Sequence, residues 1–157
     1  MKSLRIGIIP LTDAEPIVAA HEYGFFAKHG LAVELSCEPS WATVRDKLAA
    51  GALDAAHLLA PMALAASLGI GPYAEPIATG LSLGLGGDAI CVSQALRARI
   101  PVLAGDARGA ARGLAGVVAE RRALGAPPLR LATVFPFSMH EYLLRDVQGT
   151  EGHWTPL

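Results

Sequence analysis

The stretch EPSWATVRDKLAAGALD, residues 38–54, sets the interpretation of the chain on both sides of it. Ser40 has the chemistry of a helix N-cap, so Trp41 is predicted as the first residue of a short amphipathic helix. The preceding residues 31–39 (LAVELSCEP) alternate apolar and polar side chains, which predicts a β-strand. The following residues 53–60 (LDAAHLLA) predict a second, buried strand. A strand, a helix and a strand in this order are typical of a parallel sheet.

The same alternation extends outward to both ends of the chain. Gly30 and Gly51 mark the predicted C-terminal ends of two helices. Further strands are predicted over residues 4–11, 75–87, 88–94 and 129–137, and further helices over residues 15–30, 61–71 and 108–125 and from residue 138. The predicted fold class is α/β, with a mostly parallel sheet flanked by helices.

Composition limits the partners of this chain. Its 157 residues are enough for one domain with a sizeable core. The formal net charge of −1 predicts neither a nucleic-acid surface nor an anionic-membrane surface. The hydrophobic fraction is 52% and the mean hydropathy is +0.40, which is apolar for a chain of this size. The isolated cysteines Cys37 and Cys91 form no metal or redox motif and are predicted to be buried, reduced thiols.

Two apolar segments raise the question of a membrane. The run at residues 4–11 is too short for the apolar region of a signal peptide, so the protein is predicted to stay in the cytoplasm as encoded. Residues 55–74 are uncharged and long enough to span a bilayer, but prolines and glycines interrupt them. A buried strand followed by a buried helix is the better interpretation, and no membrane span is predicted.

No motif in the sequence supports catalysis. Nucleophile-elbow, zinc-protease and cysteine-cluster signatures are absent, and GLGGD at residues 84–88 fits neither a Walker loop nor a dinucleotide-binding loop. Asp13 is interpreted as a turn or capping residue, and His57 as a core histidine with satisfied hydrogen bonds. The chain is predicted not to be an enzyme, with no catalytic residue, no cofactor and no metal site.

The turns that follow the predicted strands are the candidate binding positions. In open α/β sheets, ligands lie beyond the carboxyl ends of the strands, and unpaired N–H groups at helix starts favour small anions. Trp41 and His140 both lie in the first turns of such helices. They are either an indole wall and an imidazole donor facing one crevice, or a core aromatic and a solvent-exposed helix residue. The spacing leaves both interpretations open.

Three segments resemble the nitrate- and bicarbonate-binding proteins of ABC importers. These segments are LRIGIIPLTDAEPIVAAHEYGFFAKHGLAVEL (4–35), PSWATVRDKLAAGALDAAHLLAPM (39–62) and VFPFSMHEYLLR (134–145). The resemblance implies a type II periplasmic-binding-protein-like fold, with the anion held between two lobes. Its implied boundaries are residues 1–94 for most of the first lobe, 95–145 for the crossover and the start of the second lobe, and 146–157 for a divergent, poorly ordered tail.

The resemblance also implies which residues meet the anion. The tryptophan of the SWAT motif, here Trp41, lines the pocket, and the histidine of the later strand-to-helix turn, here His140, contacts the anion. The complete set of implied ligand-binding residues is Trp41, His140, Asp88, Ser40, Thr43 and Pro61.

One residue of this set departs from the family pattern. The family carries an amide in GNAIT or GQAIT, whereas this chain reads GDAIC and places the Asp88 carboxylate there. Two unit charges about 4 Å apart repel by roughly 4 kcal/mol at a dielectric constant of about 20. Asp88 is therefore predicted to abolish weak anion binding, to change the ligand, or to bring in a cation together with bicarbonate.

The implied functions are of three kinds. The first is a solute-binding protein for nitrate, nitrite or bicarbonate in an ABC import system, truncated in its second lobe; importer-type relatives act outside the inner membrane. The second is a cytosolic nitrate or nitrite sensor that binds a regulatory, antiterminator-type protein. The third is a fragment that binds no ligand. A pyrimidine-precursor enzyme is disfavoured because it needs a cysteine-rich segment.

The partners follow from these functions. They are a small inorganic anion and either an ABC permease or a regulatory protein, with no direct contact to nucleic acid. A second copy of the chain is a further expected partner, because a lobe without its neighbour exposes apolar surface.

Overall fold

The computed structural model describes residues 2–71, 74, 76–84, 87–100 and 105–149. The chain divides into two compact units, Met1–Gly87 and Asp88–Leu157. The predicted lobe boundary lies later, after residue 94, and the assignment of lobes stays a prediction.

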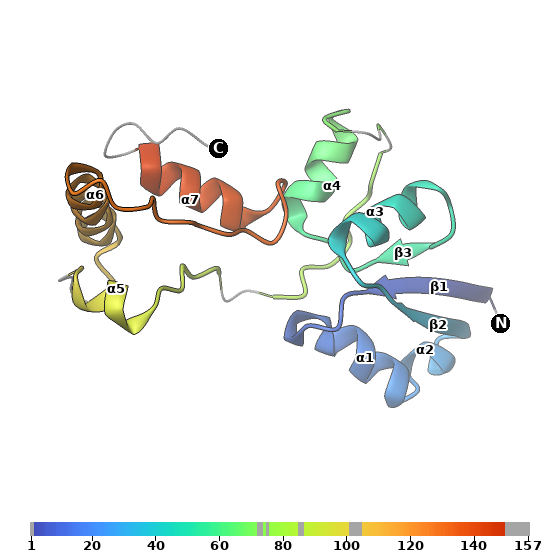
Figure 1. Cartoon of the computed structure of the whole chain (residues 1–157). Helices are drawn as coiled ribbons and strands as arrows, with labels where there is room; N and C mark the ends of the chain where they lie inside the picture. Colours follow the sequence, from blue (N-terminus) through green and yellow to red (C-terminus); the bar gives the residue numbers. More distant parts are fainter. Residues whose placement is uncertain (1, 72–73, 75, 85–86, 101–104, 150–157) are drawn as a thin grey trace. The chain divides into compact units, whose positions relative to one another are not determined.

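The first unit is built on a parallel sheet of three strands in the order β2-β1-β3 (Figure 1). The strands are β1 (Lys2–Ile8), β2 (Leu31–Cys37) and β3 (Ala55–Ala56), and β1 pairs with both neighbours. The predicted α/β class with a parallel sheet is therefore confirmed. The third strand is shorter than the predicted 53–60, because only Ala55 and Ala56 pair with β1.

Helices cover both faces of this sheet. Figure 1 shows α1 (Glu15–Glu22) and α2 (Phe25–Lys28) on one face and α3 (Trp41–Ala49) on the other. A short 3₁₀ helix, η1 (Thr12–Ala14), precedes α1, and α4 (Ala60–Ser67) follows β3. The single helix predicted over residues 15–30 is two helices, because Gly24 adopts a left-handed φ of 69° between them.

The buried core of the first unit lies toward the carboxyl end of the sheet. Ile8 at the end of β1 is buried, whereas Lys2 and Ser3 at its start are exposed. A Cβ atom on Gly7 would come within 2.5 Å of a methyl group of Leu53, so glycine permits the close approach of the segment after α3. Further buried apolar residues are Ala14, Trp41, Val44, Met62, Ala63, Ala65 and Ala66.

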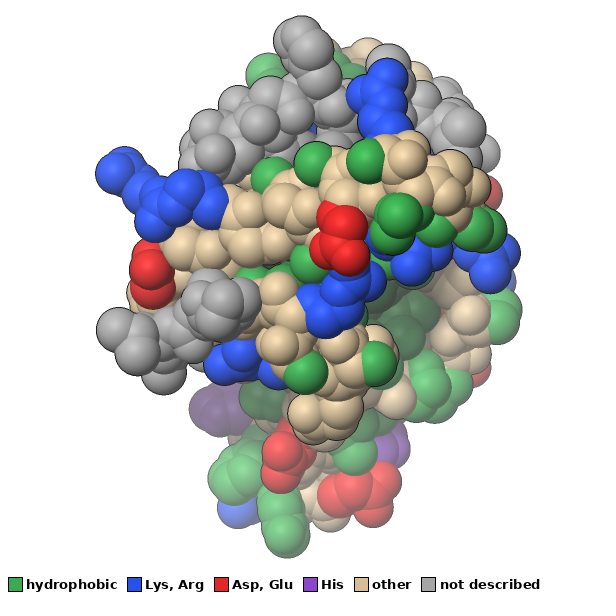
Figure 2. All heavy atoms as spheres, turned by 60° about the vertical axis from the view of Figure 1, so that its left-hand side comes forward, with side chains coloured by type: hydrophobic (Ala, Val, Ile, Leu, Met, Phe, Trp, Pro, Cys, Tyr) green, Lys and Arg blue, Asp and Glu red, His purple; other side chains and the backbone are tan. Residues whose placement is uncertain are grey.

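The second unit is helical in the part that the structure describes. It contains α5 (Gln94–Ala98), α6 (Ala107–Ala123) and α7 (Met139–Gly149), and Ile100, Ala111, Val117 and Leu144 are buried in it. The helix predicted over 108–125 is confirmed as α6. Figure 2, which brings this end of the chain forward, shows Lys and Arg side chains scattered among acidic and apolar ones rather than gathered in one field.

Several sequence predictions for residues 75–157 were wrong. The described residues of 75–87, 88–94 and 129–137 form no strand. An apolar run becomes a strand only where a neighbour pairs its N–H and C=O groups, and local sequence does not supply that neighbour. The helix predicted from residue 138 is α7, and it continues to Gly149, into the segment 146–157 that the resemblance implies as a tail. Residues 150–157 of the predicted tail lie outside the described residues.

Two further expectations concern single features. Cys37 and Cys91 are both exposed, so the prediction of buried thiols was wrong. Cys37 ends β2, which is an outer strand of the sheet, and the alternation of its neighbours could not reveal that position. Residues 55–74 contain β3 and α4, and no helix among the described residues is long and apolar enough to cross a membrane.

Candidate functional site

The carboxyl edge of the first unit's sheet gathers side chains from three loops. Asp13 follows β1, Trp41 follows β2 and His57 follows β3. The chain leaves β1 first toward β2 and then returns to β3 on the other side, so β1 and β3 flank a topological switch point. Ligands of open α/β sheets bind at such a point, beyond the carboxyl ends of the strands.

His57 is the most buried polar side chain of this cluster. Its ring is 4% exposed, and its Nε2 atom lies 3.1 Å from Oδ2 of Asp13. Its other ring nitrogen, Nδ1, is buried and has no hydrogen-bond partner among the residues that the structure describes. Buried polar atoms are nearly always hydrogen-bonded, so an atom of this kind indicates a position for a ligand or a water molecule.

Trp41 packs against His57. The two ring centroids are 5.0 Å apart and the planes meet at 72°, an edge-to-face arrangement. Trp41 is 7% exposed, so it contributes to the core of the unit as well as to this edge.

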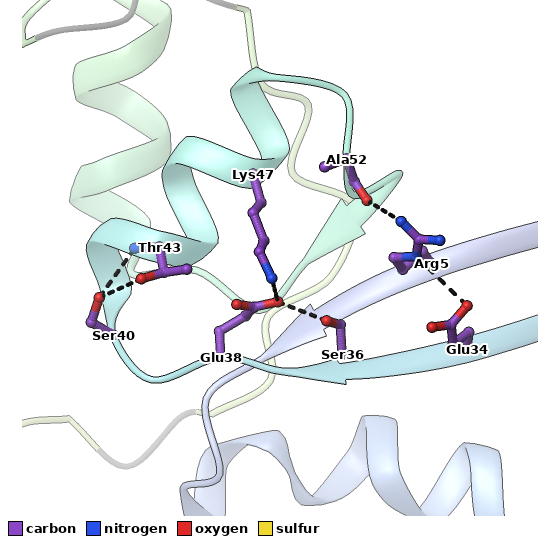
Figure 3. Close-up of polar contacts among 8 residues, drawn as sticks. All are labelled: Arg5, Glu34, Ser36, Glu38, Ser40, Thr43, Lys47 and Ala52. Carbon is purple, nitrogen blue, oxygen red and sulfur yellow. Dashed lines mark hydrogen bonds and ion pairs between the residues drawn. The ribbon is translucent and has the colours of Figure 1, made fainter.

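The start of α3 is fixed as the sequence predicted. The Oγ atom of Ser40 accepts a hydrogen bond from the backbone N–H of Thr43 at 3.1 Å, and the two hydroxyl groups lie 2.9 Å apart (Figure 3). The N-cap assignment is therefore confirmed. The first N–H groups of a helix have no acceptor within it, and in α3 these include the N–H groups of Trp41 and Ala42. The N-terminus of α3 is also the positive end of its helix dipole, which favours an anion.

A buried carboxylate lies between β2 and α3. Glu38 is 3% exposed, and its Oε1 atom accepts hydrogen bonds from Lys47 Nζ at 2.8 Å and from Ser36 Oγ at 2.7 Å (Figure 3). The hydrogen bond from Lys47 is the main cause that holds the pKa of Glu38 below its ordinary value, and the bond from Ser36 is the second. Glu38 is thus an ionised group paired with Lys47 rather than a free acid.

Replacing Lys47 by alanine is expected to lower the free energy of unfolding by about 2 kcal/mol at neutral pH, because the buried Glu38 loses its cation. Half-exposure of Lys47 keeps the loss below that of a fully buried pair. Since the pKa of Glu38 in the folded state is lowered from 4.5, this stabilisation is complete above that pH and disappears as the pH falls through the folded-state pKa. Urea unfolding at several pH values measures it.

The matched control for Lys47 is the second change Glu38→Gln. In the Lys47→Ala background it should recover part of the lost stability, since no charge then stays buried without a partner. A Lys47→Ala protein as stable as the native one would contradict the pairing.

The second unit carries a similar carboxylate–imidazole pair. Nε2 of His140 lies 3.1 Å from Oδ1 of Asp88, and the two side chains are 35% and 28% exposed. Nδ1 of His140 is buried without a hydrogen-bond partner among the described residues. The pair shows that Asp88 engages the histidine instead of standing alone as a charge.

The first turn of α7 positions His140. Ser138 is fully buried, and its Oγ atom accepts a hydrogen bond from the N–H of Glu141 at 3.2 Å. Glu141 does not return to the N–H of Ser138 as a capping box would; it binds Arg145 and Thr133 instead. The hydrogen bond from Arg145 is the main cause that lowers the pKa of Glu141, followed by that from Thr133.

The structure relates only some of the predicted site residues to one another. Ser40 and Thr43 meet at the start of α3, with Trp41 between them in sequence, and Asp88 meets His140 in the second unit. Pro61 lies in the first turn of α4. The ligand-binding roles of all six residues stay predictions.

The sequence did not reveal one contact of this edge. Asp13 lies in the 3₁₀ turn η1, in agreement with its prediction as a turn residue, and its carboxylate also lies 3.1 Å from His57. His57 is buried as expected, yet only one of its nitrogens is satisfied. The sequence did show that each of these residues follows a strand. It did not show that the two strands are neighbours in the sheet, and that order is what brings the residues together.

The cluster is suited to holding a ligand. Within the described ranges, no group of three or more His, Cys, Asp or Glu side chains is placed to hold a metal ion. The edge does provide backbone N–H groups at the start of α3, an indole ring and a buried imidazole with one unpartnered nitrogen.

Comparisons with known proteins identify the family of the chain. The model of the NMT1-like family matches residues 1–152. The nitrate import ATP-binding protein NrtC of Synechocystis sp. is 44% identical over 94 residues, which are 59% of this chain and 14% of that relative. The bicarbonate transport ATP-binding protein CmpC of the same organism is 37% identical over 147 residues, 91% of this chain and 20% of CmpC.

A further relative is named as a binding protein. The nitrate/nitrite binding protein NrtA of Nostoc sp. is 46% identical over 63 residues, which are 37% of this chain and 14% of NrtA. The matched segments thus span 14% to 20% of the lengths of these three relatives. Because the family model covers nearly the whole sequence, the chain belongs to the NMT1-like family, whose fold is periplasmic-binding-like.

Proposed function

We propose that this chain binds a small inorganic anion of the nitrate, nitrite and hydrogencarbonate class, as the solute-binding part of an ABC import system. The relatives named for nitrate import, bicarbonate transport and nitrate/nitrite binding support this class of ligand. The single observation that carries the proposal is the edge at which Trp41 packs on the half-satisfied His57, beside the N-terminus of α3.

Each contact at this edge has a defined role in the proposal. The N–H groups of Trp41 and Ala42 donate to the anion, and the indole ring of Trp41 covers its flat face. Ser40 and Thr43 hold the helix start in place through the cap. Pro61 fixes the start of α4 and contributes no N–H of its own.

In the second unit, His140 and Asp88 are the residues that the family resemblance implies as contacts of the anion. His140 stands in the first turn of α7, where the helix dipole also favours negative charge. Oδ1 of Asp88 lies 3.1 Å from Nε2 of His140 and adds a negative charge there, so Asp88 lowers the affinity for an anion in comparison with an amide at the same position. The partner that receives the bound anion is proposed to be an ABC permease.

Calorimetric titration of the native chain with nitrate, nitrite and hydrogencarbonate tests the proposal. Saturable heat is expected for at least one of the three anions. A Trp154→Phe variant leaves Trp41 as the single tryptophan, and its fluorescence should change over the same concentration range.

The matched variant for the titration is Trp41→Phe, which keeps an aromatic ring but loses the indole N–H and part of the covering surface. Its affinity should fall by about tenfold. Absence of saturable binding for all three anions, from protein that is folded by circular dichroism, would rule out this function.

The exposed side of α4 suits a second copy of the chain. Leu64 and Leu68 are 61% and 64% exposed and lie one turn apart on the same side of the helix. We therefore propose that two copies of the chain associate through this apolar side of α4.

A further inference from the structure

The contact between Asp13 and His57 determines which nitrogen of the imidazole carries hydrogen. An ionised carboxylate only accepts hydrogen bonds. The 3.1 Å approach of Asp13 Oδ2 to His57 Nε2 therefore requires a hydrogen atom on Nε2. In a neutral imidazole the other nitrogen then has a bare lone pair. In the neutral ring, Nδ1 of His57 is consequently a hydrogen-bond acceptor.

The opposite ring orientation is unfavourable. Turning the ring by half a turn would set a carbon atom against the carboxylate of Asp13. The ring is 4% exposed, so solvent would not replace the lost hydrogen bond. The carboxylate thus fixes both the orientation of the ring and its tautomer.

Other charged side chains of the edge are engaged elsewhere. Asp13 is the charged group that the described structure places against His57. The helix α4, which follows His57, contains no charged residue. On α3 and the loop before it, Lys47 pairs with Glu38 and Arg45 pairs with Asp46.

The position of the unpartnered nitrogen points to a ligand. His57 follows β3 and Asp13 follows β1, so the pair stands at the switch point between these strands. A buried acceptor without a donor is costly, and a ligand that brings a donor removes that cost. A ligand without a donor leaves the cost in place.

We propose that His57 Nδ1 accepts a hydrogen bond from the bound anion, so that the site selects a proton-carrying anion of the hydrogencarbonate class over nitrate. This inference deepens the anion-binding proposal and rests on it. Hydrogencarbonate and nitrate are both planar and singly charged, but only hydrogencarbonate has an O–H group. Nitrate turns an oxygen lone pair toward the lone pair of Nδ1, which is repulsive.

The test compares the two anions on the complete chain. Sodium hydrogencarbonate and sodium nitrate are titrated in the same buffer at pH about 8. Hydrogencarbonate should bind about tenfold or more tightly than nitrate.

Asp13→Asn removes the preference of His57 for hydrogen on Nε2, because an amide can donate to Nε2 as well as accept from it. The ratio of the two dissociation constants should then fall by about tenfold. The matched control is Glu15→Gln, which makes the same charge change two residues away at the start of α1 and should leave the ratio unchanged.

Nitrogen-15 spectra of the histidines give a readout that a structural role would not produce. Nδ1 of His57 should show the signal of a bare nitrogen in the free protein. Hydrogencarbonate should shift this signal, and nitrate should leave it in place.

The outcomes separate the two proposals. Equal ratios in the native and Asp13→Asn proteins, or a hydrogen atom on Nδ1 at pH about 8, would overturn the selectivity and leave anion binding intact. Failure of both anions to bind the native chain would overturn anion binding itself, and the selectivity with it.

Discussion

Replacing Asp88 by asparagine is expected to raise the affinity for nitrate by about tenfold or more. In the native chain the carboxylate of Asp88 lies against Nε2 of His140 and adds a negative charge beside it. An amide at this position can still accept from His140 through its oxygen, while its NH₂ group becomes a donor for an anion. Calorimetric titration with nitrate measures the change directly.

The magnitude follows from the charge and its surroundings. Two unit charges about 4 Å apart repel by roughly 4 kcal/mol at an effective dielectric constant of about 20. The Asp88 side chain is 28% exposed and shares its field with His140, so solvent and the imidazole screen much of this repulsion. If one third of the repulsion remains after this screening, it is about 1.4 kcal/mol, which corresponds to a tenfold change in the dissociation constant.

The control for this change is Glu120→Gln. Glu120 lies on α6 of the same unit and pairs with Arg99 at 2.7 Å, so its replacement makes the same change in net charge away from His140. Nitrate affinity should be the same as in the native chain. If Asp88→Asn behaves like this control, Asp88 does not act on the anion.

The elements that the sequence predicted well are those with local signals. Ser40 caps α3 through the N–H of Thr43, and Gly51 ends that segment with a left-handed φ of 71°. Both devices act within a few residues, so the chain specifies them before any tertiary contact forms. The parallel pairing of β1 with β2 was equally accessible, because a helical segment separates two strands of seven residues each.

The features that escaped the sequence depend on distant partners. Residues 129–137 have the composition of a strand, yet pairing with a neighbour decides whether they become one. The contact between Asp13 and His57 joins residues from two loops whose proximity follows from the strand order β2-β1-β3. Residue chemistry identified both side chains, but only the topology brought them together.

The two histidine pairs share one arrangement of atoms. In each, Nε2 faces an aspartate oxygen at 3.1 Å, and Nδ1 is buried without a partner within the described part of the chain. Both carboxylates therefore favour the tautomer with hydrogen on Nε2. An asparagine at position 88 removes this preference from His140, which is a second reason why Asp88→Asn should favour nitrate.

Replacing Trp41 by alanine is expected to lower the free energy of unfolding by about 3 to 5 kcal/mol. Trp41 is 7% exposed and packs edge-on against His57, so its removal leaves a cavity beside a buried, half-satisfied ring. A loss of this size is a large share of the roughly 5 to 15 kcal/mol that stabilises a typical domain. Urea unfolding followed by circular dichroism measures the change, since the variant keeps only Trp154 as a tryptophan and loses the fluorescence of Trp41.

Two further variants separate the contribution of Trp41 to the core from its contribution to the anion. Tyr23→Ala removes an aromatic side chain that is 73% exposed and should cost less than about 1 kcal/mol. Trp41→Phe retains most of the buried apolar surface, so it should keep most of the stability while weakening anion binding by about tenfold. If Trp41→Ala were no less stable than Tyr23→Ala, Trp41 would not be a core residue. Equal anion affinity in Trp41→Phe and the native chain would show that the indole only fills the core, and His57 and the N–H groups of α3 would then have to hold the anion without it.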